Sequence, residues 1–179
     1  MSADRHSVAA ANRLILLLAL AVFVADQLTK LAVLHLLGPL EERVVVEGFF
    51  KFVHWQNTGA AFSMFHQKNS ILAGISGVAV IALWIFRRHF EAQRLVGQIA
   101  LGLLFGGIVG NLLDRLLPSR QHVIDFLRFY LEPRGGGEIG FPAFNVADTA
   151  ICTGVGLLIL LSWKSNAQQN TPTDSPAPK

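Results

Sequence analysis

Two aspartates of this sequence, Asp125 and Asp148, are placed where paired carboxylates could do acid–base chemistry. Two carboxylates that share a site cannot both ionise easily, so one holds a proton while the other stays charged. Such a pair can activate a water molecule with the charged group and protonate a leaving amine with the other. Asp148, near the start of an apolar segment, is the easier one to keep ionised, because a helix N-terminus stabilises negative charge. From spacing alone, however, the better interpretation is that Asp148 caps a helix and Asp125 is a loop carboxylate.

A second set of polar residues interrupts the apolar segments. Asp26 and Lys30 are four residues apart and therefore share one face of a helix. Asn111 and Arg115 have the same spacing, with Asp114 beside them. Charged residues inside a membrane are costly, so each is a functional hypothesis by default. For the Asp26/Lys30 and Asp114/Arg115 pairs we expect a support role: a buried polar network that holds the helices together, with a share in substrate binding. The alternative is that these charged groups carry the function directly.

Three further features bear on binding. Residues 57–59, Asn-Thr-Gly, offer amide donors and acceptors to a peptide backbone, although a plain turn uses the same residue types. Gly102, Gly106 and Gly110 repeat every four residues, as at close helix contacts in membranes. The single cysteine and the lack of a cluster with metal-ligand spacing predict neither a metal nor another cofactor. No basic stripe indicates a nucleic-acid partner.

The elements that must position these residues are long apolar segments. Of the 179 residues, 52% are hydrophobic and only 15% are charged. Four segments approach the roughly 20 residues that cross a hydrocarbon core. They cover residues 14–37, 70–86, 95–117 and 143–163. The sequence therefore predicts an all-α membrane protein with four transmembrane helices.

The first apolar segment could instead be a cleaved signal peptide. It continues well beyond the usual apolar length of such a peptide, and Asp26 and Lys30 interrupt it without a small-residue cleavage pattern. We therefore expect a retained helix.

The distribution of arginines predicts the orientation of the helices. Residues 87–94 carry three arginines and residues 1–13 carry two, so both regions are expected on the cytoplasmic side. Four spans then place both termini in the cytoplasm. Residues 38–69 and 118–142 lie outside, and Asp125 and Asp148 lie at the outer membrane face.

The segments outside the membrane differ in character. Valines and aromatic residues within residues 44–55 predict a small extracytoplasmic β-region at the level of the lipid headgroups. Three consecutive glycines at residues 135–137 predict a flexible stretch that could move over a site. Residues 164–179 are too polar to bury a core and are expected to form a disordered cytoplasmic tail. Residues 1–163 then form a single membrane-embedded domain.

Five sequence motifs, taken together and in this order, resemble one family. They are Asp-Gln-Leu-Thr-Lys at 26–30, Asn-Thr-Gly-Ala-Ala-Phe-Ser at 57–63, Gly-Gly-Ile-Val-Gly-Asn-Leu-Leu-Asp-Arg at 106–115, Val-Ile-Asp-Phe at 123–126 and Phe-Asn-Val-Ala-Asp at 144–148. The family is lipoprotein signal peptidase, also called signal peptidase II, of bacteria. The resemblance covers nearly the whole chain, from Asp26 to about Leu161. The polar tail and the glycine-rich stretch lie outside these motifs.

The resemblance implies an aspartic endopeptidase of the bacterial inner membrane, with its site at the periplasmic face. Such enzymes cut the signal peptide from prolipoproteins, just before a cysteine that carries a diacylglyceryl group. The expected partners are a diacylated prolipoprotein, membrane lipid and the inhibitor globomycin. By this similarity Asp125 and Asp148 are the catalytic pair. Other positions that match the family motifs are Asp26, Lys30, Asn57, Gly107, Asn111, Asp114, Arg115, Asn145 and Ala147.

Two other classes of protein compete with this interpretation. A proton-coupled carrier could use Asp26, Lys30, Asp114 and Arg115 as a relay, and a structural membrane protein could use them only for packing. A relay would distribute its acids through the depth of the membrane, whereas a peptidase needs two acids near one surface. For a peptidase, the expected mechanism is direct attack by water without a covalent intermediate.

Overall fold

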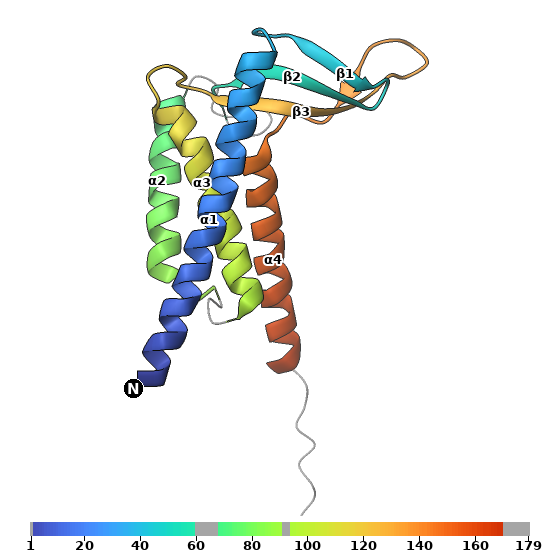
Figure 1. The fold of residues 1–179 in the computed structure, drawn as a ribbon. Coiled ribbons are helices and arrows are strands. Elements are labelled where there is room, and N and C mark those ends of the chain that lie inside the picture. Colours follow the sequence, from blue (N-terminus) through green and yellow to red (C-terminus); the bar gives the residue numbers. More distant parts are fainter. Residues whose placement is uncertain (1, 60–67, 91–93, 170–179) are drawn as a thin grey trace, which may run out of the picture.

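A computed structural model of the chain describes residues 2–59, 68–90 and 94–169, with side chains from residue 8 to residue 164 of these ranges. Four helices form a bundle, and a small sheet lies across one end of it (Figure 1). The helices are α1 (Ser2–Leu36), α2 (Asn69–Phe86), α3 (Leu95–Leu116) and α4 (Val146–Gln169). The strands are β1 (Glu42–Val46), β2 (Phe50–Asn57), β3 (Val123–Leu131) and β4 (Ile139–Gly140). The predicted fold class is confirmed.

All four helices are long and apolar enough to cross a membrane. The candidate spans are Val8–Leu36, Asn69–Phe86, Leu95–Leu116 and Val146–Lys164. Large apolar side chains point away from the protein, and Val78 and Ile159 are 68% and 59% exposed. The polar groups Asp26, Lys30 and Asp114 are instead completely buried. This inversion of the soluble pattern fits helices whose outer surface faces lipid.

Helix α3 is the centre of the bundle, because it contacts α1, α2 and α4. Glycines permit this contact. A β-carbon at Gly106 would lie 2.6 Å from the backbone oxygen of Ala19, and one at Gly107 would lie 2.5 Å from that of Ala147. Packing at this distance is a main source of helix association in lipid, where apolar burial gives no advantage. The predicted face of small residues, which includes Gly106, therefore lies at a close helix contact, as expected.

The sheet is antiparallel with the order β1-β2-β3-β4. Its first two strands fall in the segment that the sequence predicted. The nine-residue strand β3 was not predicted, because Val123, Ile124, Asp125 and Phe126 are all buried and give no alternation of polar and apolar residues. Val33 of α1 and Leu37, which directly follows this helix, pack against Ile124 and Phe126 and fix the sheet to the bundle.

The polar C-terminal tail begins later than predicted. The tail was expected to begin at residue 164, but α4 continues to Gln169, since Ala, Gln and Lys are good helix formers even beyond the membrane. The remainder of the tail, residues 170–179, lies outside the described residues.

The glycine stretch connects β3 to β4, and Gly136 and Gly137 have φ values of +80° and +86°. Figure 1 shows this connection at the end of the sheet that projects beyond the helices, which gives no support to a role over the site.

Candidate active site

Asp148 is held in the first turn of α4 by a reciprocal cap. The backbone N–H of Asp148 donates to Asn145 Oδ1 at 2.9 Å, and the backbone N–H of Asn145 donates to Asp148 Oδ2 at 3.2 Å. This capping box satisfies two N–H groups that a helix start would leave unpaired. The cap expected from spacing alone is therefore present. The other oxygen of Asp148, Oδ1, accepts a hydrogen bond from Asn111 Nδ2 at 2.8 Å.

Asp125 lies in strand β3 and not in a loop. It pairs with Trp55 of β2 across the sheet and is only 3% exposed. Asn145 Nδ2 donates to its Oδ1 at 2.8 Å, and Asn57 Nδ2 donates to its Oδ2 at 2.9 Å. Asn145 therefore contacts both carboxylates, which are 23 residues apart in the sequence.

The environment of Asp125 favours its protonated form. Its pKa is raised from 3.8 to about 7, first because burial removes the carboxylate from water and then because Asp148 is negatively charged. The amide donors of Asn57 and Asn145 and the charge of Lys30 act in the opposite direction and are outweighed. A carboxyl group with this pKa carries its proton at neutral pH about half of the time.

Lys30 is the centre of a buried ion cluster beside the two aspartates. Its Nζ lies 2.8 Å from Asp26 Oδ2, 2.6 Å from Asp114 Oδ2 and 2.9 Å from Asn111 Oδ1. The expected pair of Asp26 and Lys30 is confirmed. The expected pair of Asp114 and Arg115 is wrong, since Asp114 pairs with Lys30 and with Arg120. The side chains of adjacent residues in a helix point in different directions, so they do not face each other and do not pair.

Each of three asparagines has its amide orientation fixed by a group that can only donate a hydrogen bond: an ammonium or a backbone N–H. Lys30 can only donate, so Asn111 turns its oxygen to Lys30 and its Nδ2 to Asp148. Asn145 accepts from the N–H of Asp148, which leaves its Nδ2 for Asp125. In the same way, the oxygen of Asn57 accepts from the N–H of Gly59 at 2.9 Å and its Nδ2 faces Asp125. Both carboxylates therefore receive donors whose direction is set in advance.

Backbone contacts lock the helices together at this level. Asp26 Oδ1 accepts the backbone N–H of Ala147 at 3.0 Å, so α1 satisfies a further N–H group of the first turn of α4. Gly107 contacts the carbonyl of Ala147, and Gly110 leaves room for the Asp26 carboxylate. Gly107 and Ala147, expected as site residues, thus lie at the packing contact that holds α3 against α4.

Arg115 faces a different part of the site from Asp114. Its guanidinium donates to the backbone oxygen of Gly59 at 2.8 Å and to Asn69 Oδ1 at 3.1 Å. It thereby connects the end of the β2 segment with the start of α2. The remainder of the second sequence motif, residues 60–63, lies outside the described residues.

Sequence reasoning missed three residues of this network. Arg120 contacts Asp114 and donates to Gln27 Oε1 at 3.1 Å, and Asn69 donates to the backbone oxygen of Arg115 at 2.9 Å. Gln27 lies beside Asp26 in the first motif but was given no role, whereas Arg120 and Asn69 carry no local signal, because each reaches the site only through the turn or helix start that follows another element. Across the described ranges, no group of three or more His, Cys, Asp and Glu side chains could hold a metal ion.

Four membrane-length helices with a cluster of buried charged side chains at the sheet end define a multi-pass membrane protein with a buried polar site. The family model for signal peptidase (SPase) II matches residues 18–164. Proteins named lipoprotein signal peptidase from Symbiobacterium thermophilum and Syntrophotalea carbinolica are each 37% identical to the chain, over 81% and 85% of its length and over 91% and 92% of their own. One from Geobacter metallireducens is 39% identical over 82% of this chain and 88% of its own.

Solved structures agree with this match. A bacterial membrane enzyme solved by the in meso method has a TM-score of 0.74 and 28% identity, covering 90% of this chain and 93% of that one. A second such enzyme has a TM-score of 0.66 and 29% identity over 83% of this chain. The chain belongs to the signal peptidase II family, and is thus a membrane-embedded protease that processes prolipoproteins. The resemblance seen in the sequence is confirmed.

Proposed function

We propose that the chain is an aspartic endopeptidase that cuts diacylated prolipoproteins just before the lipid-modified cysteine. The observation that carries the proposal is the pair Asp125 and Asp148, joined through Asn145 at one end of the bundle. Membership of the signal peptidase II family supports the substrate class. The same resemblance implies that globomycin inhibits the enzyme, and we assign its binding to this site.

In the proposed reaction the two aspartates divide acid and base roles. Both carboxylates accept amide donors, but Asp148 also lies in the first turn of α4, where the helix N-terminus favours negative charge, and it is less deeply buried than Asp125. It takes a proton from water as the water oxygen attacks the scissile carbonyl carbon. Asp125, protonated at the start, donates a hydrogen bond to the carbonyl oxygen and then gives its proton to the leaving nitrogen.

The carbon–nitrogen bond breaks, and the products are a carboxylic acid on the signal peptide and an amine on the modified cysteine. Asp148 now holds the proton and Asp125 is ionised. Transfer of that proton to Asp125 through water restores the starting state. No bond forms between the protein and the substrate.

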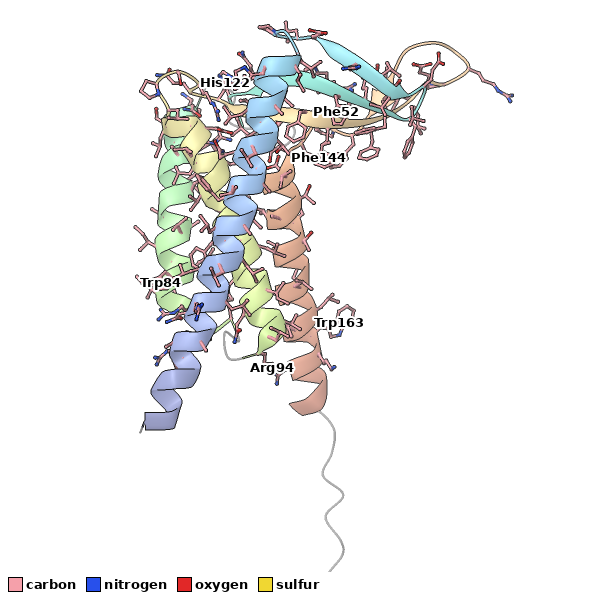
Figure 2. All side chains as sticks on the ribbon, viewed as in Figure 1. Phe52, Trp84, Arg94, His122, Phe144 and Trp163 are labelled. Atoms are coloured by element: carbon pink, nitrogen blue, oxygen red, sulfur yellow. The ribbon has the colours of Figure 1, made fainter. Side chains whose placement is uncertain are left out.

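We place the site at the periplasmic face of the bacterial inner membrane. The N-terminus and the end of α4 lie at the end of the bundle opposite the sheet (Figure 1). Trp84, Arg94 and Trp163 lie near that same end, as Figure 2 shows. Tryptophans are typical of either membrane interface, and an excess of arginines is typical of the cytoplasmic one. Phe144 lies at the junction of the sheet and α4, at the opposite end. Both termini are then cytoplasmic.

This orientation can be tested by thiol labelling. In a background with Cys152 replaced, a cysteine at Lys68 should react with a membrane-impermeant reagent in intact cells, and a cysteine at Arg88 should react only after the membrane is opened. The reverse pattern would contradict the orientation.

The carrier alternative is less well supported by the position of the charges. Asp26 and Lys30 lie in the last third of α1, and Asp114 lies in the last turn of α3, so these charges gather near one end of the bundle. They are also paired with one another, whereas a relay needs acids spread through the membrane. We therefore retain the peptidase as the single proposal.

The direct test is digestion of a diacylated prolipoprotein by the purified protein, followed by mass analysis of both products. We expect one cut, immediately before the modified cysteine, and no cut in the same prolipoprotein without the diacylglyceryl group. Cleavage of both forms at equal rates would contradict the requirement for the lipid.

A further inference from the structure

Arg120 lies outside all five sequence motifs, yet it contacts the buried ion cluster next to Asp148. We propose that Arg120 is a positioning residue: it balances the two carboxylates around Lys30 and so keeps Asn111 directed at Asp148. The activity part of this inference rests on the proposed peptidase function.

The turn after α3 brings Arg120 back to the helix it follows. The backbone N–H groups of Arg120 and Gln121 both donate to the oxygen of Leu117, at 2.9 and 3.0 Å. Gln121 has a φ of +57°, a left-handed conformation that reverses the chain. The hydrogen bond to Leu117 holds Arg120 beside the last turn of α3, where its side chain contacts Asp114 and is only 11% exposed.

The charges of the cluster balance only when Arg120 is counted. Asp26 and Asp114 contribute two negative charges, and Lys30 and Arg120 contribute two positive ones. The first three of these residues are fully buried. Without Arg120, one negative charge would remain uncompensated in a site of low dielectric, which is strongly unfavourable. This negative charge would also lie close to the carboxylate pair, where it would disfavour the ionised form of a neighbouring carboxyl group.

Lys30 transmits the effect to Asp148. Its ammonium group is shared by Asp26, Asp114 and Asn111, at 2.8, 2.6 and 2.9 Å. If Asp114 loses Arg120, we expect it to draw Lys30 closer and to weaken the bond to Asn111. The amide of Asn111 is then free to turn, and Asp148 loses the donor that lies 2.8 Å away. Arg120 thus acts on the reaction through three intervening side chains.

The first experiment measures kcat and KM for Arg120→Met with a diacylated prolipoprotein, at equal amounts of folded enzyme. We expect kcat to fall about tenfold while KM changes less than about twofold, since the substrate contacts are retained. Arg120→Lys should restore most of the kcat. The control is Arg43→Met, which removes an exposed arginine of the outer strand β1 and should leave kcat unchanged. Wild-type kcat in Arg120→Met would overturn the proposal, as would an equal loss in the control.

A double variant tests the charge balance itself. Asp114→Asn combined with Arg120→Met leaves Asp26 and Lys30 as a neutral pair. The double variant should therefore melt at a higher temperature than Arg120→Met alone and recover part of its kcat. If the two changes simply add, the charge-balance role is wrong. This holds even where Arg120→Met yields little folded protein, because the double variant and Arg120→Lys should then restore it.

The melting temperatures separate the two proposals. Their measurement needs no substrate. Arg120→Met should therefore melt at a lower temperature than the double variant, whatever the enzyme cleaves. A wild-type enzyme that fails to cut the prolipoprotein would contradict the proposed function, whereas a wrong order of melting temperatures would contradict the role of Arg120.

Discussion

The two ends of the helix bundle are held together by different kinds of contact. At the end away from the sheet, Ile15, Leu101 and Phe105 form an apolar cluster, with Val80 and Leu83 packed against it. At the sheet end, the apolar contact of Val33 with Ile124 and Phe126 lies beside buried charges and amides that are joined by directed hydrogen bonds. The contacts at the first end depend on the shapes of apolar side chains, whereas those at the sheet end depend on the exact positions of hydrogen-bond donors and acceptors.

This difference separates stability from activity within one small fold. Apolar packing in lipid tolerates moderate changes of side chain, because the surroundings are also apolar. A buried polar cluster is costly to assemble, and its retention at one membrane surface indicates that it serves the reaction. Substitutions at the apolar end should therefore change how much folded enzyme exists, and those at the sheet end should change what each folded molecule does.

The largest effect is expected at the carboxylate pair. Asp125→Asn and Asp148→Asn should each reduce cleavage of a diacylated prolipoprotein by about a thousandfold or more, because a carboxamide cannot exchange the proton. The double variant should be no worse than either single one, since the two groups act as a unit. Glu132→Gln, an exposed carboxylate on the sheet side, is the matched control and should cleave normally. Substantial turnover by either Asp variant would rule out the two-aspartate mechanism.

A smaller loss of activity is expected when Asn145 is replaced. This residue both donates to the two carboxylates and caps α4. Asn145→Ala should reduce kcat about tenfold to a hundredfold, because both carboxylates lose a positioned donor or cap. It should also destabilise the protein by about 1 kcal/mol through the loss of the helix cap. Initial rates and thermal unfolding of the same preparation measure the two effects. A change in stability alone would mean that Asn145 only caps α4.

A graded effect is expected from pH. The pKa of Asp125 is raised to about 7, so its proton is present below that pH and is lost above it. Cleavage should therefore fall about tenfold per unit as pH rises beyond about 7. The native state also binds this proton more tightly than the unfolded state does, so stability from this group should decrease as pH rises from about 4 to about 7. A rate that stays constant to pH 9 would contradict Asp125 as the acid.

The smallest effect on activity is expected at the apolar end. Leu101→Ala removes a fully buried side chain and should lower the free energy of unfolding by about 2 kcal/mol. The rate per folded molecule should stay within about twofold of the wild type, since the carboxylate pair lies at the other end of the bundle. Measurement of kcat after correction for folded protein tests this. A tenfold fall in that corrected rate would mean that the two ends are not independent.

Much of the fold could be predicted because lipid imposes simple rules on the sequence. The ends of the apolar segments at residues 70–86 and 95–117 agree with α2 and α3 to within one residue. Strand β3 could not be predicted in the same way, since burial on both faces removes the alternation on which a strand signal depends. The motif positions identified the aspartates, but not that Asp125 lies in a strand opposite Trp55.

The pairing of charges was the least predictable part. Sequence proximity suggested Asp114 and Arg115 as partners, yet the helix turns them to α1 and to the start of α2 respectively. Spacing by four residues succeeded for Asp26 and Lys30, because it reflects helix geometry. Arg120 could not be assigned at all, since its place depends on the turn in which its backbone N–H donates to the oxygen of Leu117.

The central claim is that Asp125 holds the proton while Asp148 is ionised, and infrared spectroscopy of the carboxyl groups tests it most directly. The protonated carboxyl band should be recorded as a function of pH for the wild type, Asp125→Asn and Asp148→Asn. We expect a band that disappears as pH rises through about 7 in the wild type and that is missing from Asp125→Asn. In Asp148→Asn it should persist but titrate at a lower pH, since burial remains and the neighbouring charge is gone. A band retained in Asp125→Asn and missing from Asp148→Asn would contradict the assignment.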